Sequence, residues 1–253
     1  MAVTNQKGGV GKTTTAVNVA LFISDFGYRT LLIDLDPQAN ATSAIGIAVT
    51  TIRYSIYDVL SGTHALDDCT YPTAFENLHL LPASHALAGA DVELSQIVSR
   101  ETMLRQMLQP IQSEYDYIII DCAPSLSLLT LNAFTASQQL IIPLQCEYFA
   151  LEGLAKLMST FQLVKDRINP SLNVLGIVLT MFDRRTQLNR QVVANAKSHF
   201  KNLVFDTIIP RNIRLAEAPS FGLPIALYQP RSSGSIAYYH LTKEVIHRAQ
   251  TKP

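Results

Sequence analysis

Two lysines in one glycine-rich stretch are the first residues whose spacing suggests chemistry. Lys7 and Lys12 stand five positions apart in NQKGGVGKTTT, residues 5–15. The ordinary phosphate loop, G-x-x-x-x-G-K-[ST], does not fit, because Gln6 occupies its first glycine position. The variant K-G-G-x-G-K-[ST] does fit. Its glycines let backbone amides at a helix start close on phosphate oxygens, which predicts a nucleotide-binding loop.

Each residue of this loop has an expected role. Lys12 is expected to contact the β- and γ-phosphates, Thr13 to join the Mg²⁺ shell, and Thr14 to reach the α-phosphate of ATP. Lys7 is the lysine that an ordinary loop does not need. It could reach a second nucleotide and so join two protomers, or it could be a solvated side chain. The predicted nucleotide contacts are Lys7, Gly8, Gly9, Val10, Gly11, Lys12, Thr13 and Thr14.

Two aspartates follow apolar strands and complete this predicted site. Asp36 ends the stretch LLIDLD, and Asp121 ends YIIID. Carboxylates at such strand ends beside a phosphate loop hold Mg²⁺ or the attacking water. We expect Asp36 to position the water and to lie near the metal, and Asp121 to bind the metal through water molecules. Lys7, Lys12 and Asp36 are the predicted catalytic residues, and Thr13, Asp36 and Asp121 the predicted metal site.

The elements around these residues predict an α/β fold. Apolar spacing indicates a helix at 13–26, and continuous apolar runs indicate buried strands. The expected strands are 30–35, 117–121, 139–143, 174–180 and 207–210, and the helices between them lie near 125–137, 151–168 and 187–201. We therefore expect one domain, residues 1–253, with a mostly parallel twisted sheet flanked by helices on both faces. Ligands then bind at the carboxyl ends of its strands.

Three further segments complete the sequence-based prediction of the fold. Residues 40–115 are less regular, with one expected helix at 101–109. The pair Tyr148–Phe149 is expected to open a helix and to pack. The last helix, near 235–250, is expected to pack on the core through Ile236, Tyr239, Ile246 and Ala249, and the alternative is a helix on a membrane surface.

The formal net charge of zero hides an uneven distribution. Residues 1–180 hold nine Lys+Arg against sixteen Asp+Glu, whereas residues 181–253 hold eleven against four. This asymmetry suggests a face that meets a polyanion, and a solvated basic surface is the alternative. The start of the chain leaves no room for a signal peptide, so we expect a cytoplasmic protein. Three widely spaced cysteines suit reduced thiols better than disulfides or a metal cluster.

The chain resembles the chromosome and plasmid partitioning ATPases, the ParA/Soj branch of the deviant Walker A class. The stretches that carry the resemblance are NQKGGVGKTTTAVNVA, LLIDLDPQANATSAIG, YDYIIIDCAPSLSLLTLNAFTAS, QCEYFALEGL and IIPRNIRLAEAPSFGLPI. It implies that Lys7 crosses the interface of an ATP-bound sandwich dimer and that Gly8 lies where the two backbones approach. It further implies that Asp36 is needed for hydrolysis. Residues Met181, Pro210 and Arg211 resemble those around the adenine, and Thr180 replaces an asparagine that some relatives use there.

The resemblance also implies how such a protein works. The family binds double-stranded DNA without sequence preference as an ATP-dependent homodimer on the nucleoid, without a membrane. A ParB/Spo0J-like centromere-binding partner stimulates its weak ATP hydrolysis, which releases the DNA and positions a chromosome or plasmid. Arg185 and Arg214 match its DNA-contacting arginines, and the weaker candidates are Lys197, Lys201, Arg231 and Lys243. The alternatives are a MinD-like or orphan ParA-like ATPase that positions a protein cargo, and an electron carrier like the nitrogenase iron protein.

Overall fold

The computed structural model of the chain describes residues 1–147 and 150–251, without the side chains of Asp91 and Ser95. The predicted helix start at Tyr148–Phe149 lies outside the described residues. The core of the molecule is a seven-stranded sheet in the order β3-β4-β2-β5-β1-β6-β7. All neighbouring strands are parallel except β3 and β4. The strands are β1 (Ala2–Val3), β2 (Thr30–Leu35), β3 (Tyr71–Pro72), β4 (Leu78–Leu81), β5 (Tyr117–Cys122), β6 (Gln139–Gln145) and β7 (Asn173–Thr180).

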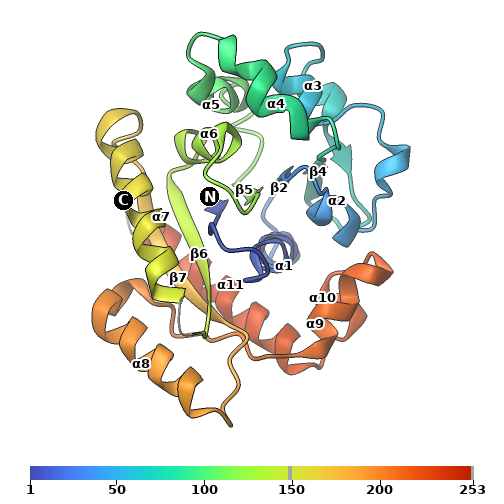
Figure 1. Cartoon of the computed structure of the whole chain (residues 1–253). Coiled ribbons are helices and arrows are strands. Elements are labelled where there is room, and N and C mark those ends of the chain that lie inside the picture. Colours follow the sequence, from blue (N-terminus) through green and yellow to red (C-terminus); the bar gives the residue numbers. More distant parts are fainter. Residues whose placement is uncertain (148–149, 252–253) are drawn as a thin grey trace.

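Helices cover both faces of this sheet, as the sequence predicts (Figure 1). On one face α1 and α11 pack together with α2, and on the other lie α3 to α7. The helices are α1 (Lys12–Asp25), α2 (Asn40–Ala44), α3 (Ile56–Leu60), α4 (Leu87–Glu93), α5 (Met103–Leu108), α6 (Leu128–Ala136), α7 (Ala150–Arg167), α8 (Gln187–Phe200), α9 (Ile213–Glu217), α10 (Ile225–Tyr228) and α11 (Ser233–Thr251). Short 3₁₀ turns η1 (Val49–Thr51), η2 (Asp67–Cys69), η3 (Leu94–Gln96), η4 (Arg100–Thr102), η5 (Lys201–Leu203) and η6 (Ala218–Phe221) connect them.

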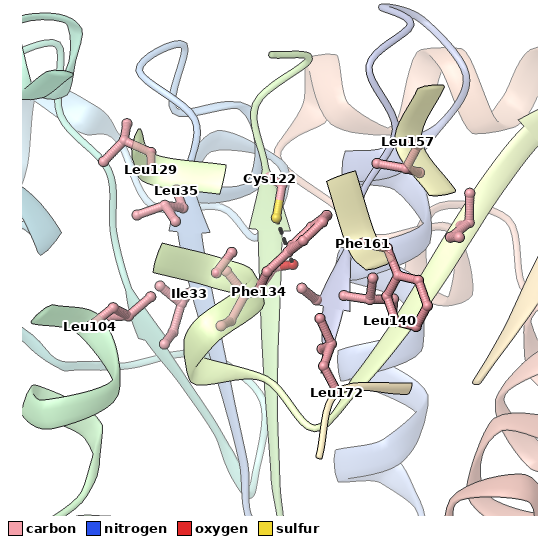
Figure 2. Close-up of a cluster of buried hydrophobic side chains, with 14 of the residues drawn as sticks. Ile33, Leu35, Leu104, Cys122, Leu129, Phe134, Leu140, Leu157, Phe161 and Leu172 are labelled. Carbon is pink, nitrogen blue, oxygen red and sulfur yellow. Dashed lines mark hydrogen bonds between the residues drawn. The ribbon is translucent and has the colours of Figure 1, made fainter. Parts of the chain in front are cut away.

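The strands are apolar throughout because both of their faces are buried. Along β2, Leu31, Ile33 and Leu35 pack on the α6 side, whereas Leu32 packs on the α1 side. Figure 2 shows the first cluster, in which Phe134 of α6 lies among strand residues that include Cys122. The same alternation places Asp34 of β2 and Asp121 of β5 on the α1 side, where the glycine loop begins.

The strand register brings the predicted site together. Val3, the last residue of β1, pairs with Asp121 of β5, and Asp121 pairs in turn with Asp34 of β2. The glycine loop leaves β1 at this same edge of the sheet. Ligand sites of open parallel sheets lie at the carboxyl ends of the strands. Three neighbouring strands therefore deliver the loop and two carboxylates to one place.

The strand predicted at 207–210 is wrong. This segment has no ladder with β7, only single contacts such as the bond from the Ile209 amide to the Leu179 carbonyl, 2.8 Å. The amides of Asp206 and Thr207 donate instead to the Glu244 carboxylate, at 2.9 and 3.1 Å. Pro210 has no amide hydrogen to donate. At the start of this segment, hydrogen bonds to the Glu244 side chain thus take the place of pairing with a neighbouring strand.

The face predicted for the last helix is also partly wrong. α11 packs on the core, but Ile236 is 49% exposed, and the buried hydrophobic residues of this helix are Tyr238, Leu241 and Val245. Tyr239, Ile246 and Ala249 lie at the margin of this contact. The Tyr238 hydroxyl meets the Thr15 hydroxyl of α1 at 3.1 Å, so a long-range polar contact fixes the rotation of the helix.

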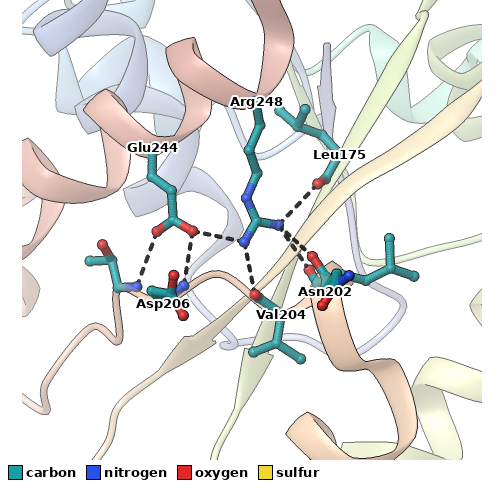
Figure 3. A network of polar contacts seen from close by, with 8 residues as sticks. Leu175, Asn202, Val204, Asp206, Glu244 and Arg248 are labelled. Carbon is teal, nitrogen blue, oxygen red and sulfur yellow. Dashed lines mark hydrogen bonds and ion pairs between the residues drawn. The ribbon is translucent and has the colours of Figure 1, made fainter. Parts of the chain in front are cut away.

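Arg248 of α11 joins this helix to the edge strand β7 and to the loop around Val204 (Figure 3). The Arg248 guanidinium donates to the Val204 carbonyl at 2.9 Å and to Glu244 at 2.7 Å, and lies 4.3 Å above the Phe205 ring. It also donates to the carbonyls of Leu175, Asn202 and Leu203. With the bonds from Glu244, this network holds residues 202–207, which lead to Pro210.

Substituting Gly176 of β7 by alanine is expected to destabilise the protein by about 1–3 kcal/mol, because overpacking a closed core forces strain. The new Cβ would clash with the Phe205 ring. That ring is fully buried and covered by Arg248. Urea unfolding measures the effect. Gly153→Ala on α7 is the matched control, because its Cβ meets nothing within 4 Å. Equal stability of the two variants would contradict this packing argument.

Candidate nucleotide-binding site

The glycine loop adopts backbone angles that only glycine tolerates well. Gly9 has φ of 74° and Gly11 has φ of 90°, both in the left-handed region. Gly11 caps α1, so the first amides of that helix have no partner within the helix and face the loop. Gly8 differs, because a Cβ there would meet no described atom within 4 Å and its φ is not left-handed. The fold of this chain does not itself require glycine at position 8.

Lys12 lies inside the loop. It is only 6% exposed, and its ammonium donates to the Lys7 carbonyl at 3.1 Å. Burial lowers the pKa of Lys12, and the negative charge of Asp121 is the strongest opposing effect. The ammonium therefore stands where a phosphate group in the loop would meet it.

Lys7 lies at the rim of the loop. Its ammonium forms an ion pair with Glu147, and its side chain is 42% exposed. Glu147 also accepts a hydrogen bond from the Gln145 side chain at 2.6 Å, and the Lys7 amide donates to Asn5 at 3.0 Å. The two lysines thus occupy different places. Glu147 is absent from the sequence-based prediction, because it stands 140 residues away and no local pattern marks it.

Asp121 has the properties of a cation ligand. It is buried, and among the residues that the structure describes neither of its carboxylate oxygens has a hydrogen-bond partner. Burial raises its pKa well above the ordinary value, and Asp34 raises it further, whereas Thr13 and Lys12 oppose the change. An unpaired buried carboxylate is costly unless a cation compensates it. The donor set of Asp121, Asp36 and the Thr13 hydroxyl fits Mg²⁺, which prefers oxygen ligands.

The other two aspartates are held by the chain itself. Asp36 is nearly buried, and its carboxylate accepts the Gln38 amide at 3.0 Å. Asp34 accepts the amide and the hydroxyl of Thr42 at 2.8 and 2.7 Å, and the Asp36 amide at 3.2 Å. Burial is the main cause that raises the pKa of Asp34 to about 6, against the lowering effect of these bonds. The sequence-based prediction assigns no role to Asp34 or Thr42.

The residues predicted around the adenine lie next to the loop. Phe182 and Pro210 form an isolated bridge, and the Arg211 amide donates to the Phe182 carbonyl at 3.0 Å. These bonds place Met181, Pro210 and Arg211 together. Thr180, just before them, donates its hydroxyl to the Val10 carbonyl at 2.9 Å and so joins β7 to the loop.

A cleft of about 450 Å³ begins at Thr13 and Thr14 and runs between α2 and the segment from α9 to α10. Beyond these two threonines, the lining includes residues that the sequence-based prediction omits, namely Asn18, Ser43, Leu215, Ser220 and Ile225. Asn18 is held there, because its side chain accepts the Ile225 amide at 2.9 Å and donates to the Thr14 carbonyl at 2.8 Å. The cleft extends the loop site along α1.

Acidic neighbours hold both arginines predicted to bind DNA. Arg185, 83% exposed, pairs with Asp183 at 2.7 Å, and Arg214, 51% exposed, pairs with Glu217 at 2.7 Å. Arg185 precedes α8, and Arg214 lies on α9. Figure 1 shows α8 and α9 on opposite sides of α11. The weaker candidates Lys197, Lys201, Arg231 and Lys243 are exposed as well. The structure places these cations on several elements of residues 181–253, the basic tail of the chain.

Comparison with known proteins decides the family. A family model described as "AAA domain" matches residues 1–174. The chain is 51% identical over 245 residues to the sporulation initiation inhibitor protein Soj of Bacillus subtilis, and this alignment covers 97% of each protein. It is 49% identical over 252 residues to the chromosome partitioning protein ParA of Myxococcus xanthus, covering all of this chain and 89% of that protein. The chain belongs to the ParA/Soj family of chromosome-partitioning ATPases.

A solved structure extends the ParA/Soj comparison to the fold. Cobyrinic acid a,c-diamide synthase of Mycobacterium smegmatis, solved with bound ADP and magnesium, is 34% identical with a TM-score of 0.87. The alignment covers 99% of this chain and 94% of that one. The predicted α/β fold is confirmed. Among the residues that the structure describes, no helix combines the length and the apolar character that crossing a membrane requires.

Proposed function

We propose that this ParA/Soj-family chain is an ATP-driven DNA-partitioning switch. In this proposal ATP joins two protomers into a sandwich dimer, the dimer binds double-stranded DNA without sequence preference, and hydrolysis separates the protomers and releases the DNA. Residues 1–253 act as one ATPase domain, and residues 181–253 supply most of the DNA-binding surface. The protein then works in the cytoplasm on the nucleoid.

The different positions of the two lysines carry this proposal. Lys12 is buried in its own loop, whereas Lys7 reaches outward to Glu147 at the rim. A phosphate group bound in the loop has Lys12 beside it, so Lys7 is available for phosphates bound by a second protomer. Gly8 supports the same arrangement, because a Cβ at this position would meet none of the described residues within 4 Å, so only a close approach from a second protomer would require glycine there.

Hydrolysis is assigned to the buried residues. Lys12 and the loop amides hold and orient the phosphates of ATP, which is mainly an electrostatic and positioning task. Thr13, Asp36 and Asp121 would hold Mg²⁺, which neutralises the charge that develops on the phosphate oxygens. Asp36 orients the attacking water, and Met181, Pro210 and Arg211 surround the adenine.

DNA binding depends on dimerisation through simple bivalence. One protomer offers few phosphate contacts, and each of its two main arginines is partly neutralised by an acidic neighbour. Joining two such surfaces makes the second contact intramolecular, so affinity rises without any new type of contact. A ParB/Spo0J-like partner that stimulates the weak hydrolysis would then release DNA locally and move the attached chromosome or plasmid.

The decisive experiment measures binding to a long duplex of unrelated sequence without nucleotide and with ADP, ATP or a slowly hydrolysed ATP analogue. The series is repeated at several salt concentrations. The proposal predicts salt-sensitive binding with ATP and its analogue alone. Anionic lipid vesicles form a parallel arm. Binding to the vesicles without binding to DNA would favour a MinD-like function instead.

Arg214→Glu is expected to keep the ATP-dependent dimer and lose most DNA affinity. Two contacts per dimer disappear, so the slope of log affinity against log salt should fall by about two. Arg53→Glu makes the same charge change on an exposed residue outside the basic tail and serves as the control. An unchanged salt slope in Arg214→Glu would remove this residue from the DNA surface.

A further inference from the structure

The buried carboxylate of Asp34 holds the segment that carries Asp36. Asp34 ends up beside Asp121 in the sheet, yet the two differ in their surroundings. Asp121 has unpaired oxygens, whereas Asp34 accepts the amide and hydroxyl of Thr42 and the amide of Asp36. A carboxylate satisfied by so many donors within its own chain has little capacity left for a ligand. Its bonds instead fix Asp36 and Thr42 relative to the end of β2.

Thr42 is the centre of this arrangement. Its hydroxyl donates to Asp34 at 2.7 Å and accepts the Ala83 amide at 3.2 Å, which joins α2 to the loop after β4. Thr42 is fully buried. Because one hydroxyl serves as both donor and acceptor, no apolar side chain of the same shape can replace it.

The turn between Asp36 and Thr42 needs such a restraint. Ala39, which lies between them, has φ of 50°, in the left-handed region that is unfavourable for a residue with a Cβ. Its amide donates to the Asp36 carbonyl at 2.9 Å, and its carbonyl accepts the Ser43 amide at 3.1 Å. A strained conformation persists only where its surroundings hold it. Releasing Thr42 would let the turn relax and move the Asp36 carboxylate.

We propose that Thr42 is a positioning residue for ATP hydrolysis. Through its bonds to Asp34, Thr42 holds the turn that places Asp36. This inference rests on the proposed role of Asp36 in orienting water. It predicts a defect in turnover rather than in nucleotide binding, since the loop that binds the phosphates is built from Gly9 to Thr14, before β2. A displacement of about 1 Å in a reacting group can lower a rate about a hundredfold.

The test compares Thr42→Val, which has the same shape without the hydroxyl, with Thr42→Ser, which keeps it. For Thr42→Val we expect kcat at saturating ATP and Mg²⁺ to fall about 10- to 100-fold. The KM for ATP and the affinity for ADP should stay within about twofold, because the residues that bind phosphate are unchanged. Thr42→Ser should restore most of the turnover. Gly176→Ala, destabilised at a distant strand, controls for lost stability alone.

The outcomes separate this inference from the function on which it rests. Wild-type kcat in Thr42→Val, an equal loss in Thr42→Ser, or a parallel loss of ADP affinity would each overturn the role of Thr42. Asp36→Ala is measured in the same series. If that variant hydrolyses ATP at the wild-type rate, the assigned role of Asp36 fails first. Thr42→Ala provides the same comparison should Thr42→Val not fold.

Discussion

Lys7→Ala is expected to remain folded and to bind ADP, but to lose the ATP-dependent dimer. The reason is the position of Lys7 at the rim, where its ammonium pairs with the half-exposed Glu147. Hydrogen bonds to charged groups contribute about 1.5–3 kcal/mol each. A symmetric dimer loses two of them, so its formation constant should fall by a factor on the order of 10² to 10⁴. Sedimentation with a slowly hydrolysed ATP analogue measures this loss.

Glu147→Gln is the control that makes the Lys7 result interpretable. It breaks the same ion pair from the other side and leaves the Lys7 ammonium in place. Exposed ion pairs contribute roughly 0–1 kcal/mol, so neither variant should lose much stability. If the Lys7–Glu147 ion pair itself matters for folding, both variants will show the same loss of stability. If Lys7 contacts a partner's nucleotide, only Lys7→Ala will lose the dimer. A persistent ATP dimer in Lys7→Ala would refute the proposed interface role.

The central strands and the loop could be predicted because their signals are local. Thr30–Leu35 and Tyr117–Cys122 are continuous apolar runs, and buried parallel strands require such runs. The two aspartates at their ends follow from the same reasoning, since parallel strands present their carboxyl ends at one edge. The strand β4 (Leu78–Leu81), by contrast, lies in a region that looked irregular, because four residues are too few to show a pattern.

What the sequence could not predict depends on contacts between distant residues. The segment 207–210 has the composition of a strand, but the amide of its first residue, Thr207, donates to Glu244, 37 residues later. Glu147 meets Lys7 from 140 residues away. Asp34 and Asp121 are each the last residue but one of an apolar strand, and only their surroundings distinguish them: Asp34 accepts bonds from Thr42 and the Asp36 amide, whereas Asp121 is unpaired among the described residues. Such differences arise from packing and leave no periodic pattern.

Asp36→Ala is expected to bind ATP and to stop hydrolysing it. Lys12 and the loop glycines remain in place, so the phosphates are still held, while the group that orients the water is gone. Loss of a positioned catalytic group costs about 10² to 10⁴ in rate. Phosphate release measures turnover. DNA binding should then persist with ATP itself as well as with the analogue.

Combining the two substitutions distinguishes the order of events. Asp36→Ala should hold the switch closed on DNA, whereas Lys7→Ala should hold it open. If closing precedes hydrolysis, the double variant must behave like Lys7→Ala, with no dimer and no ATP-dependent DNA binding. Asp116→Ala, at an exposed ion pair with Arg29, controls for the loss of one aspartate. Stable DNA binding by the double variant would mean that the dimer forms without Lys7, and wild-type turnover in Asp36→Ala would remove Asp36 from the mechanism.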